Sequence, residues 1–130
     1  MHTAPAAIAR YRDVDLAARI AGATPHQLVA MLYDGLIASL GGAARASQAA
    51  QRMRTVTKSL AILDALEANL DFGSGGKVAR TFATLYGELR ALVVAGSSEA
   101  RPELFDAAAA RIRTVGAAWR AIAPSGAAPA

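Results

Sequence analysis

Apolar residues recur at every third or fourth position in four separate stretches of the chain, a spacing that predicts four amphipathic helices. The first stretch follows Thr24, whose hydroxyl can cap free backbone N–H groups, and Pro25, which suits the first helical position. Its leucines recur every fourth residue beside a second apolar stripe. The resulting broad face contains Leu28, Val29, Leu32, Tyr33, Leu36, Ile37 and Leu40.

The three later stretches carry equally regular apolar faces. The second contains Met53, Val56, Leu60, Leu63, Leu66 and Leu70. The third, whose 4-3-4-3 spacing is that of a bundle seam, contains Val78, Phe82, Leu85, Leu89 and Leu92. The fourth contains Phe105, Ala108, Ile112, Val115, Trp119 and Ile122, so Trp119 is predicted to be a core residue.

Glycine and proline mark the predicted boundaries between these helices. The glycine-rich residues 71–76 are predicted to end the second helix, because glycine can adopt the left-handed conformation that turns the chain. Gly96-Ser97-Ser98 is the next predicted break, Pro102 opens the last helix, and Pro124 ends it. After the first helix, composition alone favours a turn at Gly41-Gly42, since two glycines inside a helix cost roughly 2 kcal/mol relative to alanine.

Four helices of comparable length with short connections imply an all-α fold, an antiparallel four-helix bundle. We assign residues 23–123 to this bundle. Residues 1–22 contain few sizeable apolar residues, and Gly22 separates them from Thr24, so they are predicted to form a short, weakly held helix or lid. Residues 124–130 are only Ala, Pro, Gly and Ser and are predicted to form a disordered tail.

The composition indicates a small helical protein, and the absence of cysteine suits a cytoplasmic one. Hydrophobic residues make up 54% of the chain but aromatics only 5%, so alanine supplies much of the apolar content and allows close helix packing. The chain contains no cysteine, which excludes disulfides and thiolate chemistry. No uncharged apolar run reaches the roughly 18 residues of a membrane span, and no secretory signal is recognised, so membrane insertion is not expected.

The net charge of +4 includes one acid-free stretch that contains Arg45, Arg52, Arg54 and Lys58. Such a stretch suits either a solvated helix face or a patch that binds nucleic acid or an acidic partner. No aromatic residues alternate with these cations to stack on bases, so no nucleic-acid partner is predicted. A basic helical bundle that binds nucleic acid is kept as the alternative function.

Residues suited to catalysis or metal binding are sparse. His2 and His26 have no Glu-x-x-His neighbour, which argues against a di-iron bundle, and His26 is interpreted as a polar residue of a first helical turn. Asp34 and Glu88 are the carboxylates nearest to apolar stripes, but acid–base catalysis needs two such groups that converge in a pocket. The chain has neither a nucleophile elbow nor a P-loop. The sequence therefore predicts no enzyme activity, no cofactor and no metal.

The most specific segment of the chain is residues 24–35, which read Thr-Pro-His-Gln-Leu-Val-Ala-Met-Leu-Tyr-Asp-Gly. A buried helix does not require Tyr33-Asp34-Gly35 in succession, and the segment resembles the start of the first long helix in the FliS family of flagellin export chaperones. Further matches follow in that family's order and spacing, at Tyr11, Lys58, Leu70-Asp71, Gly75-Gly76, Leu85-Tyr86 and Trp119. Gly41-Gly42 departs from the family pattern, in which larger residues are usual.

The resemblance implies a cytoplasmic bundle that binds the C-terminal segment of newly made flagellin, prevents its premature polymerisation and presents it to the flagellar export gate. The flagellin-binding residues that it implies are Tyr11, Leu28, Leu32, Tyr33, Asp34, Leu85 and Tyr86. It also favours a later turn after the first helix, near residues 47–51, and an N-terminal segment that either covers the binding groove or contacts the client. The sequence leaves open whether the two tyrosines also line a partner groove or only pack in the core, and whether the free protein is a homodimer.

Overall fold

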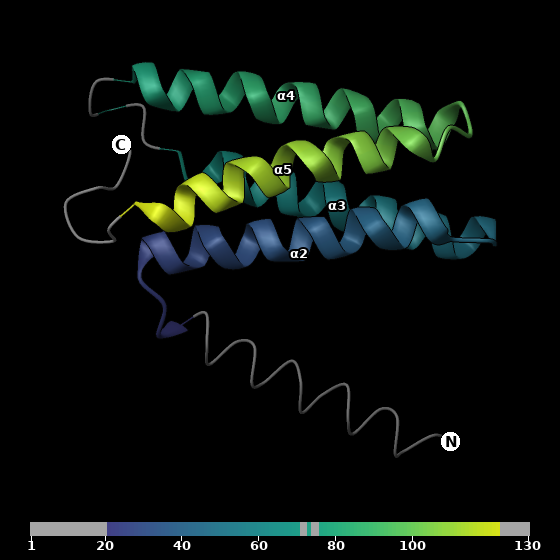
Figure 1. Cartoon of the computed structure of the whole chain (residues 1–130), viewed down its shortest axis with the longest axis horizontal. Coiled ribbons are helices and arrows are strands. Elements are labelled where there is room, and N and C mark those ends of the chain that lie inside the picture. The colour runs from purple at the N-terminus through teal and green to yellow at the C-terminus, as the bar shows by residue number, and fades with distance from the viewer. Residues whose placement is uncertain (1–20, 71–72, 74–75, 123–130) are drawn as a thin grey trace, which may run out of the picture.

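The computed structural model describes residues 21–70, 73 and 76–122. They form four helices: α2 (Pro25–Arg45), α3 (Ala49–Ala68), α4 (Lys77–Ser98) and α5 (Glu103–Ala121). Successive helices run in opposite directions, and α5 returns to lie beside α2, so each helix packs mainly against two neighbours (Figure 1). The predicted all-α, antiparallel four-helix bundle is confirmed. The predicted tail, and the predicted lid up to residue 20 with Tyr11 in it, lie outside the described residues.

The first bundle helix begins where the sequence predicted, at a reciprocal cap. The Thr24 hydroxyl accepts a hydrogen bond from the Gln27 backbone N–H at 3.1 Å, and the Gln27 side-chain oxygen accepts one from the Thr24 N–H at 2.9 Å. Two N–H groups without partners in the helix are thus bonded, which stabilises the helix start by about 1 kcal/mol. Pro25 takes the first helical position, where its missing N–H costs nothing.

Helix α2 continues through the glycine pair, so the later turn is confirmed and a turn at Gly41-Gly42 is excluded. The helix ends at Arg45 and α3 begins at Ala49, so the turn comprises residues 46–48 and lies slightly earlier than residues 47–51. A Cβ atom at Gly42 would lie only 3.2 Å from Cγ2 of Thr55 on α3. Glycine therefore allows a close approach of α2 to α3 at this level.

A buried hydroxyl pair lies at the same interface between α2 and α3. The hydroxyls of Ser39 and Ser59 are 2.8 Å apart, and each also lies within hydrogen-bond distance of the Thr55 carbonyl. Both serines are buried, so their hydroxyls need these partners in place of water. Small residues and a satisfied polar contact together give this interface its close packing.

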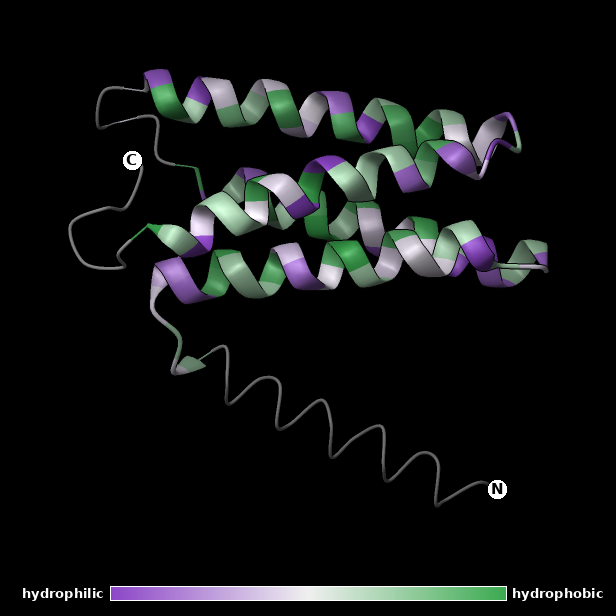
Figure 2. Cartoon of the chain, viewed as in Figure 1, coloured by the Kyte–Doolittle hydropathy of each residue, from purple (hydrophilic) through white to green (hydrophobic). Residues whose placement is uncertain are grey.

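All four helices contribute to one continuous core. Its largest fully buried hydrophobic side chains are Tyr33, Tyr86, Phe105, Leu36, Leu40, Leu63, Leu66, Leu89, Ile112 and Val93. In Figure 2 hydrophobic and hydrophilic residues alternate along every helix, as expected where each helix buries one face. The described part of the chain thus hides its apolar stripes by mutual packing.

The predicted seam of α4 is only partly the buried one. Leu89 is buried as predicted and Val78 is 45% exposed, whereas the other buried residues of the helix's inner face are Ala79, Tyr86 and Val93. Adjacent residues of a helix point about 100° apart, so the two stripes adjoin, and packing against α3 and α5 selects the one with the tyrosine.

Two other residues of the predicted apolar faces are also exposed. Met53 is 57% exposed in the second turn of α3, and Ile122 is 37% exposed directly after α5. At these helix ends fewer neighbouring helices are available to cover a side chain.

The predicted break at Gly96-Ser97-Ser98 is wrong, because α4 runs through all three residues. Gly96 is buried, and a Cβ atom there would lie 2.9 Å from Cε1 of Phe105 on α5. Glycine is required here for close packing of α5 on α4 and does not turn the chain. The turn is made by Ala100, whose φ of 53° is left-handed, and by the Arg101 N–H, which bonds the Gly96 carbonyl at 3.0 Å.

The glycine-rich connection between α3 and α4 is described only at Gly73 and Gly76. Gly76 has a φ of 54° and directly precedes α4. The left-handed glycine that the sequence predicted thus lies at the start of α4 and does not close α3, which ends at Ala68.

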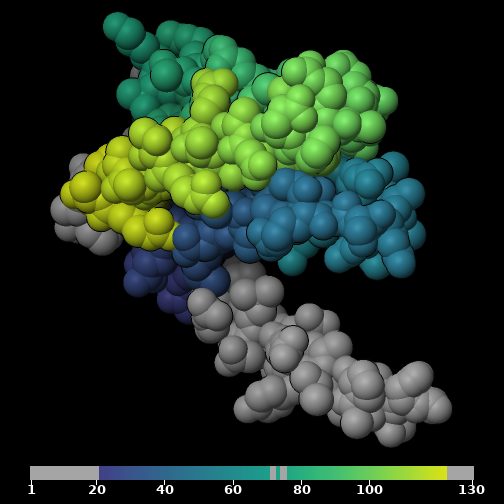
Figure 3. Space-filling view, turned by 45° about the vertical axis from the view of Figure 1, so that its right-hand side comes forward, coloured from purple at the N-terminus to yellow at the C-terminus, as the bar shows by residue number. Residues whose placement is uncertain are grey.

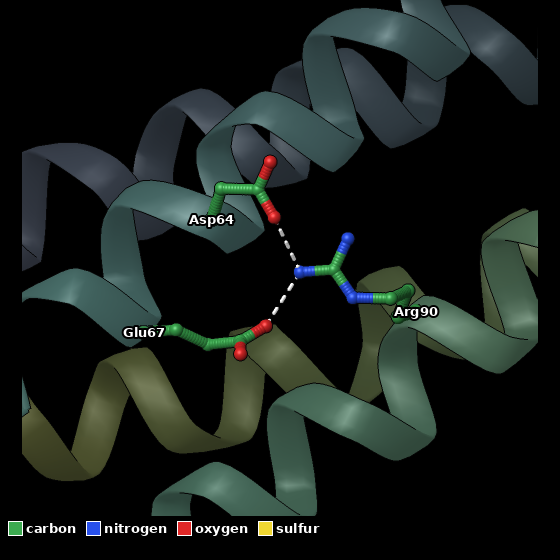
Figure 4. A network of polar contacts seen from close by, with 3 residues as sticks. All are labelled: Asp64, Glu67 and Arg90. Carbon is green, nitrogen blue, oxygen red and sulfur yellow. Dashed lines mark hydrogen bonds and ion pairs between the residues drawn. The ribbon is translucent and has the colours of Figure 1, made fainter.

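An exposed ion-pair network joins the second half of α4 to α3. The Arg90 guanidinium donates a hydrogen bond to Asp64 at 2.7 Å and another to Glu67 (Figure 4). Exposed ion pairs contribute about 0–1 kcal/mol each, so this network orients the two helices and contributes little to folding.

Candidate functional site

A groove with an almost entirely apolar wall lies between α4 and α5, at the end of the bundle where α4 begins and α5 ends. Its volume is about 320 Å³, and it is lined by Thr81, Phe82, Leu85, Thr114, Val115, Ala118, Trp119 and Ile122. In Figure 1 the two helices meet at the turn that connects them and diverge toward this end. A concave apolar surface of this kind suits apolar side chains of a partner better than it suits water.

A second hollow continues this groove toward the middle of the bundle. Its volume is about 430 Å³, and it is lined by Thr81, Thr84, Leu85, Glu88 and Arg111. The Arg111 guanidinium donates to Glu88 across the two helices at 2.7 Å. The combined surface is therefore apolar at one end and carries a pair of opposite charges at the other.

Trp119 forms the floor of the groove and is only 7% exposed. Its indole N–H donates to the backbone carbonyl of His26 at 2.9 Å, and the Trp119 carbonyl lies 2.9 Å from His26 Nε2. Because a carbonyl only accepts, Nε2 carries a hydrogen. The two rings stack with their centroids 4.9 Å apart and their planes at 14°. These contacts join the first turn of α2 to the last turn of α5.

The role of His26 was missed by the sequence interpretation, which treated it only as a polar residue of a first helical turn. Its side chain is 8% exposed, so it belongs to the interior. His26 and Trp119 are 93 positions apart, and no local pattern links them. The Phe82 ring also meets Trp119 edge-on, at a centroid distance of 6.3 Å. The floor of the groove thus combines residues from α2, α4 and α5.

The unusual string Tyr33-Asp34-Gly35 contacts all three other helices. The tyrosine hydroxyl bonds the hydroxyl of Tyr86 on α4 at 2.8 Å. The aspartate accepts a hydrogen bond from Arg120 on α5. A Cβ atom on the glycine would lie 3.5 Å from the side chain of Ile62 on α3. Three successive residues point in three directions, so this string joins α2 to the whole bundle.

Of the predicted flagellin-binding residues, one lines the apolar groove and two lie beneath it. Leu85 is half-buried in the groove wall. Tyr33 is fully buried, and Tyr86, which is 2% exposed, borders a small inner cavity with Phe82 and Trp119. The structure therefore places both tyrosines in the core, while Leu85 is open to a partner.

The other predicted binding residues lie on different faces. Leu28 and Leu32 are half-buried, and they precede Gly35 by seven and three residues, which puts them on the side of α2 that faces α3. Asp34 is exposed beside α5. Tyr11 lies outside the described residues. The predicted set does not form one surface, and its role in binding stays a prediction.

A more open hollow lies on the other side of α5, against α2. Figure 3 shows this face of the molecule, on which α5 lies between α4 and α2. The hollow has a volume of about 550 Å³ and is lined by Gly22, Ala23, Gln27, Ala30, Met31, Asp34 and Arg120. Its ion pair must lose water when covered, so it suits an apolar segment less well than the groove between α4 and α5 does.

The hydroxyl pair in the core makes a prediction about alkaline pH. Burial raises the pKa of both Tyr33 and Tyr86 above the ordinary value of a tyrosine, about 10. The stabilising contribution of the pair is thus fully present below about pH 10 and is lost as the pH rises above that value. We expect the double variant Tyr33→Phe, Tyr86→Phe to lose less stability at alkaline pH than the wild type does, measured by urea unfolding from about pH 8 to about pH 11.

The single variants are the control for this prediction. Each should lower the free energy of unfolding by about 1–3 kcal/mol at neutral pH, because one buried hydroxyl keeps no partner. The double variant should lower the free energy of unfolding by less than the sum of the two single-variant losses. If the double variant and the wild type lost the same amount of stability at alkaline pH, groups other than the two tyrosines would be the cause.

The acid-free basic stretch lies toward the opposite end of the bundle from the apolar groove. Arg45 ends α2, and Arg52, Arg54 and Lys58 lie in the first half of α3. Within the part of the chain that the structure describes, none of these four side chains forms an ion pair, and none lines the groove. Their arrangement is that of a solvated helix face.

The described residues contain no group of three His, Asp or Glu side chains that could hold a metal ion. Asp34 and Glu88 lie at different helix interfaces and do not converge. Helix α2 is long and apolar enough to cross a membrane by length and composition alone. Its residues Val29, Tyr33 and Leu36 are buried against the other helices, so its apolar face is used within the bundle.

Comparison with known proteins points to one family. The family model described as "Flagellar protein FliS" matches residues 7–126. The chain belongs to the FliS family. It is 27% identical over 119 residues to the flagellar secretion chaperone FliSB of Pseudomonas aeruginosa, a match covering 89% of this chain and 94% of the relative. The flagellar secretion chaperones FliS of Salmonella typhimurium and Vibrio cholerae are each 26% identical, over 128 and 117 residues.

The match to the Salmonella protein covers 95% of this chain and 94% of the relative. The match to the Vibrio protein covers 88% and 86%, so the similarity extends along most of each sequence. The resemblance found in the sequence is confirmed. Membership of the FliS family supports a role as a flagellar export chaperone, which is a non-enzymatic role, with flagellar proteins as partners.

Proposed function

We propose that this FliS-family protein is a cytoplasmic chaperone that binds the C-terminal segment of flagellin, prevents premature polymerisation and presents the subunit to the flagellar export gate. The observation that carries the proposal is the apolar groove between α4 and α5. Family membership supports a flagellar client, and the groove supports a client segment with an apolar face.

The groove has the form that an amphipathic helix requires. Phe82 and Leu85 are three residues apart on α4, while Val115 and Trp119 are four apart on α5, so each pair faces the groove from one side. A helix with apolar residues at three- and four-residue spacing can lay that face between the two pairs. Covering the apolar face of the client in this way prevents it from packing against other flagellin subunits.

A client that reaches the other predicted residues must extend around the bundle. Leu28 and Leu32 lie toward α3, and Asp34 lies between α2 and α5. A segment that is disordered before binding can cover several faces, at the cost of the free energy needed to order it. We propose Leu85 as a direct contact, with Tyr33 and Tyr86 supporting the groove from beneath. Tyr11 is proposed as either a client contact or part of a lid.

Size-exclusion chromatography with monomeric flagellin tests the proposal. We expect a complex with about one-to-one stoichiometry, and none with a flagellin that lacks its C-terminal helices. Equal binding to the truncated flagellin would contradict the proposed site on the client. The elution volume of the free chaperone shows in the same experiment whether it is a homodimer. Binding of an export gate component to the complex, but not to free flagellin, tests whether the chaperone presents flagellin to the gate.

The alternative function, nucleic-acid binding, is distinguished by salt. Phosphate contacts made by Arg45, Arg52, Arg54 and Lys58 would weaken steeply with ionic strength, with a slope of log K on log salt of about −0.9 per phosphate. Apolar docking in the groove changes little with salt. Salt-sensitive binding of duplex DNA together with no binding of flagellin would favour the alternative.

A further inference from the structure

We propose that the first half of α4, residues 77–86, is a movable gate that opens the α4–α5 groove by bending at Gly87. The inference rests on the proposed function, because the opened groove is where the client segment would enter. Three features of α4 carry it: the distribution of cavities along the helix, the unequal packing of its two halves, and the position of the glycine between them.

The cavities along α4 gather at its first half. Thr81, Phe82 and Leu85 line the groove, and the adjoining hollow reaches along α4 only as far as Glu88. On the inner side, Phe82 and Tyr86 border a cavity of about 30 Å³. The second half of α4 borders that hollow at Glu88 and a cavity of about 80 Å³ at Gly96. A segment with empty space beside it can move without displacing other atoms.

The second half of α4 is held firmly. Leu89 and Val93 are fully buried, and Gly96 lies directly against the ring of Phe105. On the outer side, Arg90 bonds two carboxylates of α3, as Figure 4 shows. A movement of this half would break core packing and these polar contacts together.

The first half is less completely buried. Ala79 and Tyr86 are buried in it, Phe82 and Leu85 are half-buried against the core, and Lys77 and Val78 are exposed. The helix begins at Lys77, and the residue before it, Gly76, provides no side-chain cap. Tyr86 is the main attachment of this half, because its side chain is 2% exposed and its hydroxyl bonds Tyr33 on α2, so opening at Gly87 has to break this bond.

Gly87 separates the two halves and has no packing reason to be glycine. It is exposed within the helix, and a Cβ atom there would have no neighbour within 4 Å. This contrasts with Gly96 in the same helix, where a Cβ atom would collide with an aromatic ring. Glycine lowers helix stability relative to alanine, so the helix resists distortion less at this position than it would with alanine. Bending here would move Phe82 and Leu85 away from Val115 and widen the groove.

Hydrogen exchange in the free protein tests the gate without a client. We expect the amides of residues 81–86 to exchange at least about tenfold faster than those of residues 90–95, because local opening exposes only the first half. The first four amides of α4 are left out, since the start of a helix leaves them without helical partners. Equal protection of the two halves would overturn the gate.

Two stabilising substitutions then link the gate to binding. Gly87→Ala and Ala100→Gly should each raise the melting temperature by a few degrees, the first through helix propensity and the second by relieving the left-handed alanine. Gly87→Ala should slow association with the flagellin C-terminal segment by about two- to fivefold, which corresponds to the alanine–glycine difference of about 0.5–1 kcal/mol. It should also slow exchange at residues 81–86. Ala100→Gly lies outside the groove and should change neither rate.

The outcomes separate the gate from the proposed function. Unchanged association and exchange in Gly87→Ala would overturn the gate, as would a fall in its melting temperature, since glycine would then have a packing role. Equal slowing by both variants would show that stability alone controls entry, which also overturns it. If the wild type binds no flagellin segment, the proposed function fails, while the exchange comparison still decides whether the gate exists.

Discussion

Replacing Trp119 with alanine is expected to lower the free energy of unfolding by about 3–5 kcal/mol. The side chain is 7% exposed, stacks on His26 and donates its N–H to the carbonyl of that residue. Its removal leaves a cavity between α2, α4 and α5 and breaks the join between the first turn of α2 and the last turn of α5. Domains of this size have stabilities of about 5–15 kcal/mol, so urea unfolding should show a large fraction of the total lost.

Trp119→Phe is the matched control for this prediction. It keeps an aromatic ring on the groove floor but removes the indole N–H, so it should cost about 1 kcal/mol for the hydrogen bond and somewhat more for the smaller ring. If Trp119→Ala melted like the wild type and only lost client binding, the tryptophan would be an interface residue and not part of the core.

Replacing Leu85 with glutamate is expected to weaken binding of the flagellin C-terminal segment by at least about 30-fold. Leu85 lies in the wall of the apolar groove, and a carboxylate there would lose water without gaining a partner when a client helix covers it. Removing a central apolar anchor and adding a buried charge costs about 2 kcal/mol or more at protein interfaces, which is the stated loss of affinity. Isothermal titration calorimetry measures it directly.

Met53→Glu provides the control for the charge itself. Met53 is 57% exposed on α3 and does not line the groove, so the same chemical change there should leave affinity within about twofold and cost little stability, as surface substitutions usually do. Melting curves of both variants show whether the fold is retained. If Leu85→Glu bound the client with normal affinity, the client would not bind in this groove. An equal loss of affinity in both variants would indicate a general effect of net charge.

The start of α2 shows which features of the fold local sequence predicts well. Thr24, Pro25 and Gln27 lie within four residues of one another, and the cap that they form depends on no other part of the chain. The same holds for the apolar periodicity of the four helices, which indicated their number and order. These are short-range effects, so the sequence pattern is sufficient to predict them.

The glycines show where local reasoning fails. Gly41-Gly42 and Gly96 were each considered as helix breaks on composition, yet all three lie inside helices. Gly42 and Gly96 lie where another helix comes close, at Thr55 and at Phe105 respectively. A glycine that ends a helix cannot be distinguished in the sequence from one that lets another helix pack closely, because the packing residue is distant in the chain. For Gly41-Gly42 the family resemblance corrected the composition-based turn.

The candidate site was predicted only in part, for the same reason. Leu85 was named as a binding residue and lies in the groove, whereas Tyr33 and Tyr86 bond each other beneath it. Trp119 was predicted as core and is also the groove floor, and His26 was not recognised as its partner. Each of these relationships joins residues from different helices, and the sequence pattern of any single helix contains no information on its neighbours.

By itself, the sequence determined an all-α chain with four amphipathic helices, their antiparallel order, the cap at Thr24 and the resemblance to the FliS family. Those features follow from periodicity, capping and motif order, which act over a few residues or are read along the chain. Only the tertiary structure decided which of two adjoining stripes of α4 is buried, that Gly96 packs against Phe105, and that His26 bonds Trp119. It also decided where a groove remains open, because α4 and α5 diverge at this end and no other helix of the described residues fills the space between them.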